Sequence, residues 1–99
     1  MKLTYKFDKT VMELTETKNG EDIEFNITFL TNEFKQQIEK VEKHFSENNL
    51  ITDVLVYAHK NHHYQIIVRK DFYEEFVLQL FKQRLLLEVK WAEEKTKAH

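Results

Sequence analysis

The sequence predicts an α+β fold in which a mainly antiparallel sheet carries two helices on one face. Two dense apolar runs flank a short polar turn between residues 52 and 70, which is the pattern of a β-hairpin. Apolar residues recur every three or four positions over residues 31–48 and 71–83, which indicates two amphipathic helices. Alternation with a period of two near both ends of the chain predicts further strands.

The central hairpin is expected to turn over residues 60–62. This register sets Val56 opposite Ile66 and makes one face wholly apolar, because opposite residues share a face of the sheet. The other face then holds three apolar side chains that are unusual for a surface in water, Leu55, Tyr57 and Ile67.

The helix after the hairpin is expected to begin at Asp71, whose carboxylate can cap the first turn together with Glu74. Its apolar stripe consists of Phe72, Tyr73, Phe76, Val77, Leu80 and Phe81. We therefore expect a core helix, with Phe76 and Phe81 buried against the inner face of the hairpin formed by Val56, Ala58, Ile66 and Val68.

The N-terminal part predicts three strands and the first helix. Residues 2–7 alternate as in an edge strand. Asn19-Gly20 is the dipeptide favoured in type I′ turns, so residues 10–17 and 21–30 are expected to pair with Leu14 opposite Phe25. The helix that follows is expected to be capped by Thr31 or Asn32, to run to about Asn48, and to bury Phe34, Ile38, Val41 and Phe45.

Residues 84–91 allow two interpretations. Alternation of Leu85, Leu87, Val89 and Trp91 favours a last strand, whereas a continued helix would keep only Leu87 and Trp91 on the apolar stripe. With a strand the order is βββαββα(β). From residue 21 onward it resembles the ferredoxin-like split βαβ core, preceded by an N-terminal strand pair. That topology puts the last strand beside the first strand of the core, residues 21–30. The strand of residues 10–17 should already occupy that side, because it pairs with residues 21–30 in the Asn19-Gly20 hairpin. Either the last strand moves to another edge, or residues 84–92 are helical.

Composition narrows the class of protein. The 99 residues predict one domain over residues 1–91 and a frayed charged tail over 92–99. A net charge of -2 gives no overall field to attract nucleic acid or an anionic membrane. The lack of cysteine excludes disulfides and thiolate chemistry, and the single glycine excludes glycine-rich phosphate loops. Without a signal-peptide pattern or an apolar span, we expect a cytoplasmic protein with no cofactor and no membrane association.

Three histidines at the central turn, His59, His62 and His63, are the only group with metal-ligand character. Their imidazoles could bind zinc, nickel or copper, with Asp53 or His44 as more distant ligands. Neighbouring histidines in a polar turn are more often simply solvated, so we favour the solvated turn.

Nucleic-acid binding is a second hypothesis, because sheets of this order often stack RNA bases on aromatic residues beside positive charge. The candidate residues are Tyr57, Lys60, Arg69, Lys70, Lys82 and Arg84. The single aromatic residue and the 17 acidic against 15 basic residues place this hypothesis second.

The leading hypothesis is a small non-enzymatic interaction or regulatory module. Two helices can cover only one face of the sheet, so Leu55, Tyr57 and Ile67 are expected to form an exposed apolar patch. Contiguous patches of this kind usually mark an interface. A homodimer is the simplest assembly that would cover the patch, and another protein is the alternative partner.

Overall fold

The fold is described from a computed structural model, which describes residues 3–47 and 53–92. In chain order its elements are β1 (Leu3–Lys6), β2 (Met12–Asn19), β3 (Asp22–Phe29), α1 (Lys35–Glu47), β4 (Val54–Ala58), β5 (His63–Arg69), the 3-10 turn η1 (Lys70–Phe72), α2 (Tyr73–Lys82) and β6 (Glu88–Trp91). The predicted α+β class is confirmed. Neither helix in these ranges has the length and apolar character needed to cross a membrane.

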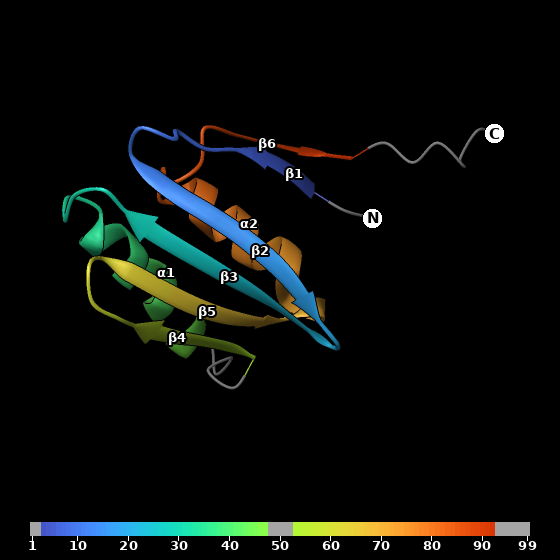
Figure 1. Ribbon diagram of the computed structural model, residues 1–99. Coiled ribbons are helices and arrows are strands. Elements are labelled where there is room, and N and C mark those ends of the chain that lie inside the picture. Colours follow the sequence, from blue (N-terminus) through green and yellow to red (C-terminus); the bar gives the residue numbers. More distant parts are fainter. Residues whose placement is uncertain (1–2, 48–52, 93–99) are drawn as a thin grey trace.

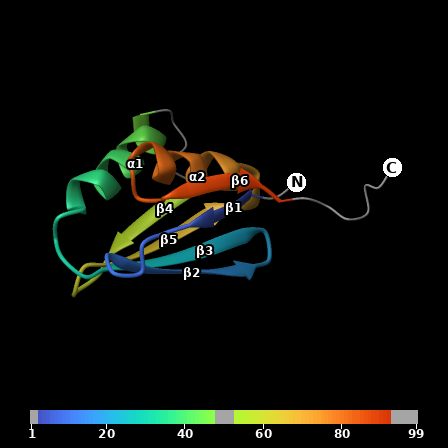
Figure 2. The same ribbon diagram turned by 90° about the horizontal axis from the view of Figure 1, so that it is seen from above.

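The main sheet has the order β2-β3-β5-β4, and β1 pairs with β6 in a separate two-stranded ribbon (Figure 1). Every neighbouring pair is antiparallel, so β3 and β4 run parallel on either side of β5, with α1 as the connection. Both helices lie on the same face of the main sheet (Figure 2). The ferredoxin-like order is not what the sheet shows: β2 lies beside β3, and β6 pairs with β1 instead. Residues 88–91 form a strand, and it is the last strand that moves.

The predicted register of the central hairpin is confirmed. Val56 pairs with Ile66, and Leu55 pairs with Ile67. Asn61 and His62 in the turn both have φ of 62°, as the two central residues of a type I′ turn require. Asparagine and histidine tolerate this left-handed conformation better than most residues, which explains how the turn closes without glycine.

The predicted register of the N-terminal hairpin is wrong by two residues. Leu14 pairs with Ile27 rather than Phe25, and Asn19 is still a strand residue opposite Asp22. The turn consists of Gly20 and Glu21, and only Gly20 has a positive φ, which is the pattern of a type II′ turn. A shift of two residues leaves every side chain on its predicted face, so the inner face of the pair remains apolar.

The core lies between the helices and the inner face of the sheet. The Phe76 ring is fully buried, with its centroid 4.7 Å from that of Phe25 in β3 and 6.2 Å from that of Phe45 in α1. Its predicted burial is confirmed. Burial of Phe81 is a wrong prediction, because its side chain is 44% exposed. Phe81 follows Phe76 by five residues and so lies about 140° around the helix from it. Ala58, at the end of β4, is also exposed.

The helix starts differ from the predictions. Asp71 lies inside η1, and no side chain caps η1 or α2. The Lys70 amide donates to the Glu21 carbonyl at 3.0 Å, so the first residue of η1 is still bonded to the end of the sheet, and the α-helix begins only at Tyr73. The first helix begins at Lys35, later than Thr31 or Asn32, and Phe34 before it is half-buried. The predicted end at Asn48 lies outside the described residues.

The end of α2 shows how the helix stops without glycine. Arg84 takes a φ of 64°, and its amide donates to the Phe81 carbonyl at 2.9 Å. The Leu85 amide donates to the Leu80 carbonyl, also at 2.9 Å. These two bonds form a Schellman motif, and the apolar side chains of Leu80 and Leu85 are both buried, as such a motif favours.

A partly buried polar contact joins the ribbon to the main sheet and to α2. The hydroxyls of Tyr5 in β1 and Tyr73 in α2 both donate to Oε2 of Glu16 in β2, the second at 3.1 Å. Burial raises the pKa of both tyrosines above the usual range, and the adjacent Glu16 carboxylate raises the pKa of each further. Both phenols therefore stay neutral at physiological pH and act as hydrogen-bond donors.

Candidate interaction surface

The face of the main sheet opposite the helices is covered by no described element, and we call it the open face (Figure 2). Alternation along each strand decides which side chains lie on it. The register aligns these side chains in rows that cross all four strands, and one row contains Thr17, Glu24, Ile67 and Leu55. The face is polar on β2 and β3 and becomes apolar toward β4.

Three side chains form the apolar patch of the open face. Leu55 is 36% exposed, Tyr57 is 46% exposed and Ile67 is half-buried. Leu55 lies directly opposite Ile67, and Tyr57 lies two residues further along the same face of β4. The predicted residues therefore do come together, although Ile67 is less accessible than expected.

A group of hydrogen-bonded polar side chains, which we call the polar cluster, borders the patch. Nε2 of His63 lies 2.8 Å from Oδ1 of Asn26, whose Nδ2 donates to Oε2 of Glu24 at 2.9 Å. The His59 ring stacks on His63 with centroids 5.0 Å apart, and its Nε2 lies 3.0 Å from Oε1 of Gln65. Neighbouring amides thus engage one nitrogen of each imidazole, and these bonds hold the rings in one orientation.

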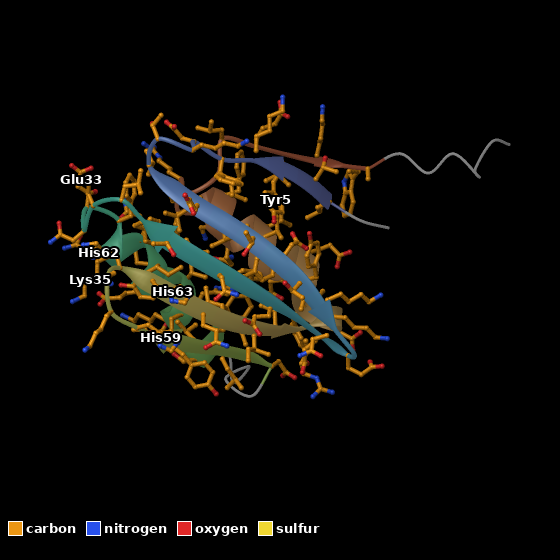
Figure 3. The ribbon with its side chains drawn as sticks, in the orientation of Figure 1. Tyr5, Glu33, Lys35, His59, His62 and His63 are labelled. Atoms are coloured by element: carbon orange, nitrogen blue, oxygen red, sulfur yellow. The ribbon has the colours of Figure 1, made fainter. Side chains whose placement is uncertain are left out.

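The turn histidines do not converge on one point. His62 lies at the end of the molecule near Glu33 and Lys35, beside the start of α1, whereas His63 lies in β5 and His59 directly follows β4 (Figure 3). Within residues 3–47 and 53–92, no three histidine or carboxylate side chains are placed to share a metal ion. The two more distant candidate ligands lie elsewhere. Oδ1 of Asp53 lies 3.5 Å from Nε of Arg69, and Nε2 of His44 lies 2.8 Å from Oε2 of Glu75, between the helices.

The basic candidates for nucleic-acid binding are divided between two sides of the molecule. Nε of Arg69 lies near Asp53, and Nζ of Lys70 lies 3.1 Å from a Glu21 carboxylate oxygen. Lys82 and Arg84 line a polar depression of about 300 Å³ between the helices, on the opposite side of the sheet from Tyr57. Lys60 lies in the exposed central turn. The structure does not gather these cations around the exposed ring of Tyr57.

The free edge of β4 carries a feature that the sequence did not predict. A groove of about 170 Å³ lies between this strand and α1, and we call it the edge groove; its lining residues are Glu42, Ser46, Val54, Leu55, Val56 and Tyr57. From the sequence, Glu42 and Ser46 are ordinary polar residues of a solvated helix face. The only available signal was the lack of charge in the five residues of β4.

Comparison with known proteins gives no relative: no family model, curated protein or solved structure matches the chain.

Proposed function

We propose that this chain is a small non-enzymatic interaction module that self-associates through the open face of its main sheet. The observation that carries the proposal is the apolar patch of Leu55, Tyr57 and Ile67 on a face that no described element covers. An apolar patch bordered by ordered polar groups is the usual anatomy of a contact surface.

A second copy is the occupant that needs the fewest assumptions, because a two-fold axis brings the same patch against itself. The polar cluster, which includes His63, Asn26 and Glu24, contains both donors and acceptors, so it can pair with the same cluster of a second copy. The patch consists of only three side chains, and we therefore expect a transient dimer at micromolar concentration rather than an obligate one.

Sedimentation of the wild type and of Leu55→Glu between about 10 and 500 μM tests the proposal. These concentrations bracket the micromolar affinity expected of a small interface. The wild type is expected to shift toward dimer mass as concentration rises, whereas Leu55→Glu should stay a folded monomer because it places a charge in the patch.

The matched control is Leu87→Glu, which makes the same change at a leucine that is 65% exposed and lies outside the open face. This variant should associate like the wild type. A wild type that is monomeric at every concentration, or equal loss of association in both variants, would refute the open face as the interface.

A further inference from the structure

The backbone of β4 offers a row of hydrogen-bonding groups that have no partner among the described residues. The His59 amide donates to the His63 carbonyl at 2.8 Å, and the Arg69 amide donates to the Asp53 carbonyl at 2.9 Å. In an antiparallel ladder the bonded residues alternate, so the odd-numbered residues of β4 bond to β5. Val54, Val56 and Ala58 therefore direct their N–H and C=O groups away from the sheet. Among the described strands β4 pairs only with β5, and Figure 1 shows it at the edge of the sheet.

The two edges of the main sheet differ in how they are protected. The β2 edge strand carries Glu13, Glu16 and Lys18, and the ribbon is joined to it through the hydrogen bond from Tyr5 to Glu16. Charged residues and covering segments are the usual devices that prevent pairing at an edge. β4, with the sequence Val-Leu-Val-Tyr-Ala, has neither a charge nor a proline. Its edge is open to an added strand.

The edge groove supplies a recognition element beside this backbone. Glu42 of α1 lines the groove together with Val54 and Val56, and no lysine or arginine is among the lining residues. Glu42 also makes no ion pair with any residue of the described ranges. Its carboxylate and that of Glu39 raise the pKa of Tyr64 on β5, after the effect of burial. The groove therefore combines strand-pairing groups with an uncompensated negative charge.

We propose that the edge groove binds an extended segment of another protein as an added antiparallel strand, with a lysine or arginine directed at Glu42. A strand that pairs with Val56 has its side chain at that position on the helix side of the sheet, toward Glu42. Its two neighbouring residues lie on the open face beside Leu55 and Tyr57 and should be apolar. The recognised pattern is thus apolar, basic, apolar in an extended segment.

Charge decides between this partner and a second copy of β4. A symmetric β4 pair centred on Val56 would bring the two Glu42 carboxylates to the same joint groove, where like charges repel. A basic segment from another protein replaces that repulsion with attraction. Strand addition does not depend on self-association of the open face, because it uses the backbone of β4 and the Glu42 carboxylate, although Leu55 and Tyr57 belong to both surfaces.

Titration of the full ¹⁵N-labelled chain with short capped peptides tests the proposal. The probe is a five-residue peptide of alternating lysine and valine, and its control alternates glutamate and valine. The lysine peptide is expected to shift the amide signals of Val54, Val56 and Ala58 and to bind about five times more tightly than the glutamate peptide. The same lysine peptide with its backbone amides N-methylated has lost the hydrogen-bond donors that would pair with β4, so it should cause no shift.

Two variants test the role of Glu42. Glu42→Lys should reverse the preference between the peptides, whereas Glu33→Lys makes the same charge change outside the groove and should keep it. Equal binding of both peptides, unchanged β4 signals, or the same response from both variants would overturn the proposal. Protection of the β4 amides that grows with protein concentration, without peptide, would also overturn it by showing that a second copy occupies the edge.

Discussion

Phe76 is the residue at which the sheet, α1 and α2 meet, since its ring is fully buried against Phe25 and Phe45. Phe76→Ala is expected to lower the free energy of unfolding by about 3 to 5 kcal/mol, through lost burial and the cavity left behind. That is a large part of the roughly 5 to 15 kcal/mol available to a domain of this size. Urea unfolding measures the loss.

Phe81→Ala is the matched control, because it removes the same ring from the same helix at a position that is 44% exposed. We expect a loss below about 1 kcal/mol there. Equal losses at the two positions would contradict the packing of α2 described above.

The contact of Tyr5 and Tyr73 with Glu16 makes stability depend on alkaline pH. The pKa of both tyrosines is raised in the folded chain, while unfolded tyrosine titrates near about 10. Above that pH the unfolded chain has released protons that the folded chain still holds, so stability falls as pH rises. Below about pH 9 both tyrosines are protonated in either state, so their contribution to stability is complete.

Urea midpoints measured between pH 8 and 11 test this dependence. The wild type should lose stability above about pH 10. A variant with both Tyr5→Phe and Tyr73→Phe should start lower, because it lacks both hydrogen bonds to Glu16, but decline less steeply. Parallel curves for the two proteins would show that these phenols do not govern the decline.

Turns show where sequence patterns fix an element and where they leave it open. The register of β4 and β5 was predictable because a single-residue slip would mix an apolar face with a polar one. The register of β2 and β3 was not, because a two-residue slip keeps both faces intact. The choice there depends on the turn, where Gly20 alone takes the positive φ.

The helix end at Arg84 offers a test at the same scale. A left-handed conformation is unfavourable for a residue with a Cβ atom, by about 1 to 2 kcal/mol. Arg84→Gly should relieve that cost and raise the free energy of unfolding by up to about 1 kcal/mol, since glycine also makes the unfolded chain more flexible. Arg84→Ala keeps the Cβ atom and should give no gain. A loss of stability in Arg84→Gly would mean that the arginine side chain itself stabilises the end of α2.

The candidate sites were predictable to different degrees for a physical reason. Leu55, Tyr57 and Ile67 follow from alternation within one hairpin, which is a local pattern. The contact of Tyr5 with Glu16 and Tyr73 joins residues separated by 11 and 57 positions in the chain, and no spacing rule indicates it. The edge groove likewise needs α1 placed beside β4, which only the tertiary fold supplies.

The molecule has two parts. One is a four-stranded sheet with two helices on one face, and the other is a separate two-stranded ribbon. β3 and β5 are internal strands with a partner on each side, whereas β1 and β6 pair only with each other among the described strands. Stability is not uniform in such an arrangement, because a peripheral unit can open while the core stays folded. The ribbon is therefore the part expected to open first.

Hydrogen exchange followed by NMR should show this order directly. Amides of β3 and β5 are expected to exchange only on global unfolding, and those of β1 and β6 through an opening of lower free energy. Tyr5→Phe removes the hydrogen bond from β1 to the Glu16 carboxylate, worth about 1.5 to 3 kcal/mol for a charged acceptor. If the ribbon opens separately, the variant should accelerate exchange in β1 and β6. The difference in opening free energy between the ribbon and strands β3 and β5 should then be larger than in the wild type. Equal acceleration in all four strands would instead mean that the ribbon unfolds only with the sheet, as one cooperative unit.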